Sequence, residues 1–92
     1  MLDEVLAQLG PREGGVYVDG TFGAGGYSAA ILKAASCRVI AIDRDPDAVS
    51  AGQGLVKAHG GRLLLVEGRF GDMVRIVREQ GIAAVDGVVI DI

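Results

Sequence analysis

Short apolar runs recur along the chain, and each ends in an acidic residue or a glycine. The run Val39–Ile42 is apolar at four consecutive positions and shows no alternation with polar residues. Uninterrupted runs of this kind are typical of strands buried on both faces of a parallel sheet. The pattern predicts four strands, over Val16–Asp19, Arg38–Asp43, Arg62–Glu67 and Val85–Ile92.

Helical signals precede the first strand and lie between the others. Apolar residues at helical spacing predict a helix over Leu2–Leu9, which Gly10 and Pro11 end. Asp45 is a suitable N-cap for a helix that has Pro46 in its first turn. The predicted helices are Leu2–Leu9, Tyr27–Ala35, Pro46–Ala58 and Asp72–Gln80.

The alternation of strands and helices predicts an α/β fold, half of a doubly wound, Rossmann-like sheet with helices on both faces. Right-handed crossovers give the parallel strand order 3-2-1-4. Ligands of such sheets bind where the winding reverses, at the carboxyl ends of the strands. Four features of the sequence converge on that edge: the glycine-rich segment after the first strand, Asp43, the turn Gly68–Gly71, and Asp91.

The glycine-rich segment Val18–Ser28 forms the predicted strand-to-helix turn. Glycines lack a Cβ atom, so the backbone can bend sharply and a ligand can approach its N–H groups. Asp43 follows about 20 residues later, the spacing at which a βαβ unit places a carboxylate on ribose hydroxyls. The two signals together predict a ribose-containing ligand that approaches the backbone of Gly20, Gly23, Gly25 and Gly26.

Composition narrows the class of protein. Ninety-two residues allow one small domain, and a net charge of −3 gives no basic footprint for nucleic acid. The single cysteine, Cys37, excludes an internal disulfide and a multi-cysteine zinc site, and no metal ligand cluster is visible. We expect no membrane span, no signal peptide and a cytoplasmic location.

Two kinds of ligand fit the glycine segment, dinucleotides and S-adenosylmethionine. A dinucleotide would bring a pyrophosphate next to Asp19, whereas S-adenosylmethionine carries a sulfonium and an ammonium and no phosphate. The third small position of the dinucleotide fingerprint is also occupied by Ser28 rather than by Gly or Ala, which departs from that fingerprint. Both points favour the methyl donor, and a non-catalytic nucleotide-binding module and a fragment of an NAD-dependent oxidoreductase are the alternatives.

The sequence resembles the bacterial ribosomal RNA small subunit methyltransferase H family along essentially the whole chain. Three segments carry the resemblance. They are Val18–Ser28 with its Asp-Gly-Thr-Phe-Gly-x-Gly-Gly string, Ala41–Ala48 with Ala-Ile-Asp-Arg-Asp-Pro, and Gly68–Phe70. The resemblance implies a Rossmann-like class I methyltransferase that uses S-adenosylmethionine to methylate N4 of a cytosine in 16S ribosomal RNA.

The resemblance also implies roles for individual residues. Gly25, Gly26 and Tyr27 would line the methionine end of the donor. Asp43 would bind the ribose hydroxyls, and Phe70 would flank the adenine. Asp91 would close the pocket. It is the candidate catalytic residue, because its carboxylate could accept hydrogen bonds from the N–H groups of the cytosine amine.

The sequence departs from the family pattern in two respects. Tyr27 stands where many members have histidine. The family's His-x-Pro-Val start, its Gly-Val-Ser-Ser continuation and its RNA-binding helical insertion are absent. We therefore expect residues 1–92 to be a partial S-adenosylmethionine-binding domain that holds the donor without competent catalysis. Its last strand would be an unpaired apolar edge, which invites pairing with a second copy, so a homodimer is a candidate assembly.

Overall fold

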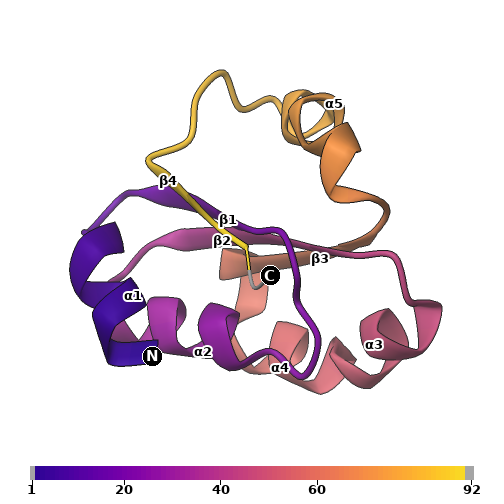
Figure 1. Cartoon of the computed structure of the whole chain (residues 1–92), viewed down its shortest axis with the longest axis horizontal. Helices are drawn as coiled ribbons and strands as arrows, with labels where there is room; N and C mark the ends of the chain where they lie inside the picture. Colours follow the sequence, from indigo (N-terminus) through magenta and orange to yellow (C-terminus); the bar gives the residue numbers. More distant parts are fainter. Residues whose placement is uncertain (1, 91–92) are drawn as a thin grey trace.

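A computed structural model describes residues 2–90 and has a parallel sheet with helices on both faces (Figure 1). The strand order is β3-β2-β1-β4, which confirms the predicted order 3-2-1-4. The strands are β1 (Val16–Asp19), β2 (Arg38–Asp43), β3 (Leu63–Glu67) and β4 (Gly87–Val89). The helices are α1 (Leu2–Leu9), α2 (Gly26–Ala34), α3 (Pro46–Ala51), α4 (Gln53–Ala58) and α5 (Met73–Glu79), with 3-10 turns η1 (Gly60–Arg62) and η2 (Phe70–Asp72).

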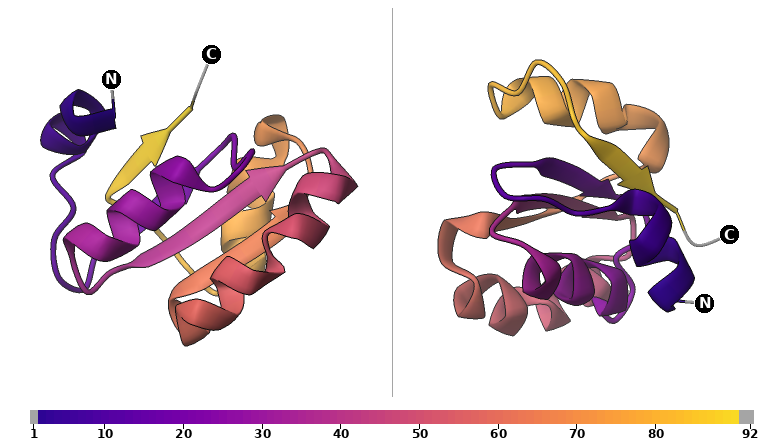
Figure 2. Two further views of the ribbon diagram at one scale, coloured as in Figure 1. Left: turned by 90° about the horizontal axis from the view of Figure 1, so that it is seen from below. Right: turned by 90° about the vertical axis from the view of Figure 1, so that its left-hand side faces the viewer.

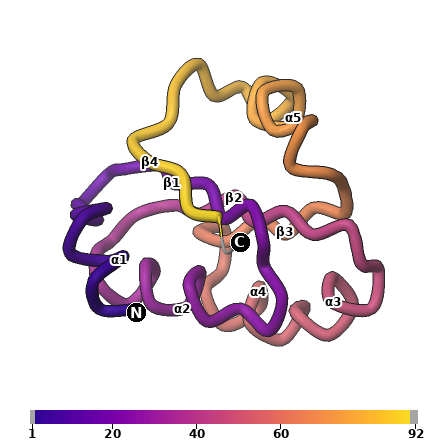
Figure 3. The backbone as a smooth tube through the Cα atoms, viewed as in Figure 1, coloured from indigo at the N-terminus to yellow at the C-terminus, as the bar shows by residue number. Residues whose placement is uncertain are grey.

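The helices divide unequally between the two faces of the sheet. Helices α2, α3 and α4 lie on one face, and α5 lies on the other (Figure 2). The backbone crosses to the α5 face after β3 and returns to the margin of the sheet as β4 (Figure 3). Since successive residues of a strand point to opposite faces, both faces need apolar side chains. This requirement explains why β2 reads as an unbroken apolar run.

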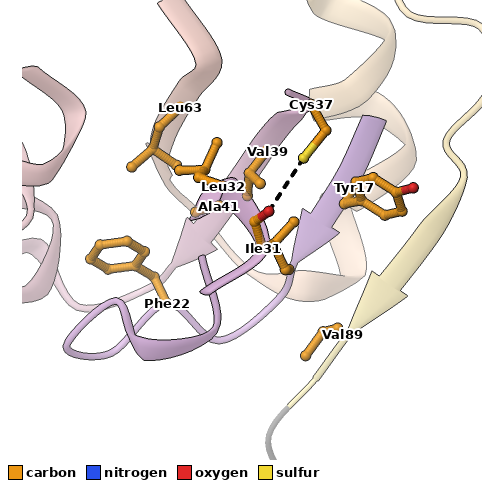
Figure 4. Packing of buried hydrophobic residues seen from close by; sticks show 9 residues of the cluster. All are labelled: Tyr17, Phe22, Ile31, Leu32, Cys37, Val39, Ala41, Leu63 and Val89. Carbon is orange, nitrogen blue, oxygen red and sulfur yellow. Dashed lines mark hydrogen bonds between the residues drawn. The ribbon is translucent and has the colours of Figure 1, made fainter. Parts of the chain in front are cut away.

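Two apolar clusters fill the space between the sheet and its helices. The cluster on the α2 face contains Tyr17, Val39 and Leu63, together with Phe22 from the segment after β1 (Figure 4). The cluster on the α5 face contains Val18, Ile40 and Ile76. Adjacent residues of β1 thus belong to different clusters, as the pleat of a strand requires.

Cys37 is a buried thiol immediately before β2. Its Sγ lies 3.5 Å from the Ile31 carbonyl oxygen, to which it donates (Figure 4). Burial raises the pKa of the Cys37 thiol, so the reactive thiolate form is disfavoured.

The predicted single helix over Pro46–Ala58 is wrong, because the structure divides it into α3 and α4 at Gly52. Gly52 is buried, and a Cβ atom there would lie 2.6 Å from the Phe22 ring and 2.5 Å from Leu65 Cδ2. The chain is therefore interrupted where it packs directly on Phe22. Helix start signals could not reveal this contact, because Phe22 comes from a distant segment.

The predicted strand over Val85–Ile92 is too long. β4 contains Gly87–Val89 and pairs with the last three residues of β1, while Asp91 and Ile92 lie outside the described residues. Before β4, the Asp86 side chain replaces further strand pairing: its Oδ2 accepts from the Val16 N–H at 2.8 Å and its Oδ1 from Arg12 Nη2 at 3.2 Å. A short partner strand and this side-chain contact explain the late start of β4.

The remaining boundaries differ from prediction by one residue at a time. Helix α2 runs from Gly26 to Ala34, and α5 from Met73 to Glu79. β3 begins at Leu63 because Arg62 belongs to η1, where its side chain forms hydrogen bonds with the end of α2 and the connection to β2. The Arg62 guanidinium donates to the carbonyl oxygens of Leu32, Ala35 and Cys37, and so caps the carboxyl end of α2.

Candidate functional site

Three connections meet at the carboxyl ends of β1, β2 and β3. Parallel strands end at a common edge, so the loops that follow them become neighbours. Between these loops lies a pocket of about 300 Å³. It is lined by Gly20, Thr21, Asp43, Arg44, Gly68, Arg69 and Phe70.

Asp43, the last residue of β2, holds two of these connections together. Its Oδ2 accepts a hydrogen bond from the Gly23 N–H at 2.8 Å, and its Oδ1 accepts one from the Asp45 N–H at 2.9 Å. A carboxylate has about four acceptor positions, so both oxygens retain capacity for further donors. The Asp43 side chain therefore fixes the glycine segment and can still accept hydroxyl groups from a ligand in the pocket.

The glycine segment turns sharply on its way from β1 to α2. Gly23 has a φ of 54° and Gly25 a φ of 89°, values in the left-handed region that favours glycine. No heavy atom lies within 4 Å of a Cβ placed on Gly23 or on Gly26, so this side of the segment is open. Gly25 instead faces the core, where its Cβ would lie 2.9 Å from the Phe22 ring.

Helix α2 begins directly at the end of this segment. Its N-cap is Gly25, which provides no side-chain hydrogen bond to the first turn. The first N–H groups of a helix lack intrahelical acceptors, and the helix dipole favours negative charge beside them. Tyr27, the second residue of α2, is half-buried and packs against the cluster on the α2 face.

Beneath the glycine segment lies a buried carboxyl group, that of Asp19. Its Oδ1 accepts from the Thr21 N–H at 3.1 Å, and its Oδ2 accepts from the Ser28 hydroxyl at 2.7 Å. Burial raises the pKa of the Asp19 carboxyl group, and these hydrogen bonds oppose that rise. Asp19 joins the two ends of the glycine segment and does not line the pocket, so its effect on a ligand is exerted through the loop.

Phe70 is the aromatic wall of the pocket. It is the first residue of η2, on the turn that follows β3, and it is half-buried. Its ring lies against the backbone of Gly20, where the segment after β1 starts. The ring thus forms part of the pocket lining while one side of it packs on the protein.

The structure brings together some of the predicted site residues. Asp43 and Phe70 line the pocket, and Gly23 is joined to Asp43 by a hydrogen bond. Gly25, Gly26 and Tyr27 lie at the start of α2 and are not among the lining residues. Asp91 lies outside the described residues.

Thr21, Arg44 and Arg69 also line the pocket, although the sequence had not singled them out as site residues. Thr21 and Arg69 lie within the glycine segment and the turn Gly68–Gly71, which were predicted to lie at this edge, whereas Arg44 lies outside the features predicted there. Thr21 follows Gly20 just after β1, Arg44 follows Asp43 at the end of β2, and Arg69 precedes Phe70. The rule that loops at the carboxyl edge surround the ligand could have found all three.

No group of three or more His, Cys, Asp or Glu side chains in residues 2–90 could hold a metal ion. No helix in the same range is long and apolar enough to cross a membrane.

Comparison with known sequences gives one consistent result. The sequence profile described as "MraW methylase family" matches residues 1–92. "Ribosomal RNA small subunit methyltransferase H" of Parvibaculum lavamentivorans is 64% identical over 92 residues, which cover the whole chain and 27% of that protein. The protein of the same name from Paramagnetospirillum magneticum is 59% identical over 92 residues, 29% of its length.

Comparison with solved structures identifies the same fold. The precorrin 8w decarboxylase of Methanobacterium thermoautotrophicum has a TM-score of 0.74 and 27% identity, over 97% of this chain and 46% of that one. A SAM-dependent methyltransferase from Aquifex aeolicus has a TM-score of 0.60 and 25% identity, over 74% of this chain and 38% of that one. Both comparisons agree with the Rossmann-like arrangement of the sheet.

Proposed function

The chain belongs to the MraW methylase family, and from this membership we propose that its pocket binds S-adenosylmethionine for methyl transfer to small-subunit ribosomal RNA. The chain spans about a quarter of the length of the curated relatives it matches, 27% in the first case. Residues 1–92 are accordingly proposed to be the donor-binding part of a methyltransferase domain.

The observation that carries this proposal is the position of Asp43. Its carboxylate lies at the pocket, tied to Gly23 at 2.8 Å and with acceptor capacity remaining. A vicinal diol presents two hydroxyl donors that one carboxylate can accept. A ribose is therefore the ligand part that this wall of the pocket fits best.

The other parts of the donor find suitable groups on either side of Asp43. Phe70 provides an aromatic surface for the adenine within the same pocket. Gly25, Gly26 and Tyr27 would hold the methionine end, where the uncapped start of α2 favours the amino acid carboxylate. The open space beside Gly23 and Gly26 leaves room for these contacts.

The bound donor would supply an electrophilic methyl group on a sulfonium. The proposed acceptor is N4 of a cytosine in 16S ribosomal RNA, a poor nucleophile because its lone pair is conjugated with the ring. Catalysis then depends on alignment and on an acceptor for the proton that the amine loses. Asp91 is the proposed acceptor, with the target base turned out of its stack.

One observation favours a different ligand class. Arg44 and Arg69 both line the pocket, and guanidinium groups are well suited to phosphates. A phosphate-bearing nucleotide such as NAD is therefore the second candidate, for a nucleotide-binding module or an oxidoreductase fragment.

Calorimetric titration of this chain distinguishes the candidates. We expect S-adenosylmethionine to bind and NADH not to bind. Asp43→Ala is expected to weaken binding about tenfold or more, because both the ribose acceptor and the contact to Gly23 are lost. Asp47→Ala is the matched control, since Asp47 is an exposed residue of α3 outside the pocket.

Binding of NADH in preference to S-adenosylmethionine would overturn the proposal. Equal affinities for Asp43→Ala and the wild-type chain would also contradict it. Circular dichroism of each variant verifies that the protein titrated is folded.

A further inference from the structure

Position 20 requires a glycine because there is no room for a side chain, and not because of its backbone conformation. Six glycines of the described chain have positive φ angles, and Gly20 is not among them. A residue with a side chain could therefore adopt the Gly20 backbone conformation. The backbone N–H of Gly20 donates to the Val89 carbonyl oxygen at 2.8 Å, a bond that most residues could also form.

The missing side chain matters because of Phe70. A Cβ atom on Gly20 would collide with the Phe70 ring, with Cε1 at 2.8 Å, and would lie 3.3 Å from Ile90 Cγ1. Contacts this short require something to move. The Phe70 ring thus occupies the volume that any side chain at position 20 would need.

Gly20 and Phe70 both line the pocket, so their contact affects its width. The Phe70 ring is seated against the end of β1 and leaves about 300 Å³ in front of Asp43 and Arg44. We propose that Gly20 is a positioning residue for donor binding: it seats the Phe70 ring, which keeps the pocket wide enough for the purine of the donor. This inference rests on the proposed function of the pocket.

A methyl group at position 20 would displace the ring from its seat. The ring then moves into the pocket, because the pocket is the free volume that adjoins both residues. The space for a purine narrows, whereas the glycine segment with Gly23 and Asp43 keeps its hydrogen bond. Donor affinity is therefore lost through Phe70, and not through the loop.

A double-mutant cycle on this chain tests the coupling. The variants are Gly20→Ala, Phe70→Ala and the combination of both, titrated with S-adenosylmethionine. Gly20→Ala is expected to weaken binding about tenfold or more in the wild-type background. In the Phe70→Ala background the same change is expected to have almost no effect, because no ring remains to be displaced.

Gly54→Ala is the matched control for the added methyl group. Gly54 lies in α4 and not in the pocket lining, and a Cβ atom there would meet no heavy atom within 4 Å. Its affinity for S-adenosylmethionine is expected to equal that of the wild-type chain. Equal losses from Gly20→Ala in both backgrounds would overturn the inference, as would wild-type affinity of Gly20→Ala itself.

A second measurement needs no ligand and separates this inference from the proposed function. The chain has two phenylalanines, so NMR can assign the Phe70 ring readily. In the wild-type chain we expect nuclear Overhauser contacts between that ring and Ile90, and in Gly20→Ala we expect them to be lost. Persistence of these contacts in Gly20→Ala overturns the seating of the ring, whatever ligand the pocket binds.

Discussion

Ser28 donates a hydrogen bond of 2.7 Å to the buried Asp19 carboxylate, and this contact joins the start of α2 to the end of β1. Both side chains have an exposed fraction of 0%. The glycine segment lies between these two residues, so its ends are held from below while its outer side stays open. Flexible residues thus form a loop of defined shape.

Replacing Ser28 tests the importance of this contact. Ser28→Ala leaves one oxygen of a buried carboxyl group without its side-chain donor, which costs about 1–3 kcal/mol of stability. Urea unfolding followed by circular dichroism measures the loss. Ser50→Ala, at an exposed position of α3, is expected to change the free energy of unfolding by less than about 0.5 kcal/mol. Equal effects of the two substitutions would contradict the anchoring role.

The carboxyl groups of Asp19 and Asp86 are expected to make stability depend on pH in opposite ways. Burial raises the pKa of Asp19 above its ordinary value of 3.8, so its ionisation costs more in the folded chain than in the unfolded one. Stability is therefore lost as the pH rises from 3.8 through the folded-state pKa of Asp19. Relative to Asp19→Asn, the wild-type chain should lose stability over this range.

The contribution of Asp86 to stability depends on pH in the opposite direction. The hydrogen bond from the Val16 N–H, followed by that from Arg12, lowers the pKa of Asp86 below 3.8. Its contribution is complete above pH 3.8 and is lost as the pH falls through the folded-state value. Chemical unfolding of the wild-type chain, Asp19→Asn and Asp86→Asn on both sides of pH 3.8 gives the stability that each carboxyl group contributes. If both contributions changed with pH in the same direction, the opposite pKa shifts of Asp19 and Asp86 would be contradicted.

Alanine substitutions at Gly52, between α3 and α4, and at Gly54, within α4, are expected to change stability in opposite directions. Gly52→Ala forces a methyl group onto Phe22 and Leu65, and overpacking of this kind costs about 1–3 kcal/mol. Gly54→Ala has open space and an α-helical backbone, so it should stabilise by about 0.4–1 kcal/mol. Thermal unfolding of both variants measures the two stability changes, a loss for Gly52→Ala and a gain for Gly54→Ala. A stabilising Gly52→Ala would show that α3 and α4 can separate from Phe22 freely.

The Arg62 side chain is expected to be important for stability although it pairs with no carboxylate in residues 2–90. Its guanidinium donates to three carbonyl oxygens, that of Leu32 in the last turn of α2 and those of Ala35 at 2.7 Å and Cys37 at 3.1 Å in the connection to β2. Arg62→Met keeps much of the aliphatic bulk but removes these donors, and we expect a loss of about 2–3 kcal/mol. Arg38→Met, at an exposed position of β2, is the control. Urea unfolding that shows equal losses for both would refute the capping role.

The sheet could be predicted from sequence because its signals are local. Buried strands need apolar residues on both faces, and the run Val39–Ile42 meets that need without reference to any other segment. Right-handed crossovers then determine the strand order, which the structure confirms. Asp43 could likewise be assigned to the site, because its distance from the glycines is a property of the βαβ unit.

Contacts between distant segments were not predictable in the same way. The interruption at Gly52 depends on Phe22, and the late start of β4 depends on Asp86 contacting Val16 and Arg12. The direction of the Asp19 side chain was not predictable either, since the sequence shows only that this charge stands immediately before the glycine segment. The structure shows its carboxyl group buried and bonded to Ser28. Each of these features requires knowledge of side-chain direction, which spacing alone does not supply.

The position of β4 has a consequence for the order of folding. β1 pairs with β2 across a single helical crossover, whereas the contact between Val16 and Asp86 joins residues 70 positions apart. Closing a longer loop costs more entropy and slows the pairing that depends on it. We therefore infer that β1, β2 and β3 associate first and that β4 adds last. The Gly20 N–H donates to the Val89 carbonyl oxygen of β4, so the seat of the Phe70 ring against Gly20 is completed only in the final stage of folding. Refolding should therefore restore helical circular dichroism before it restores ligand binding.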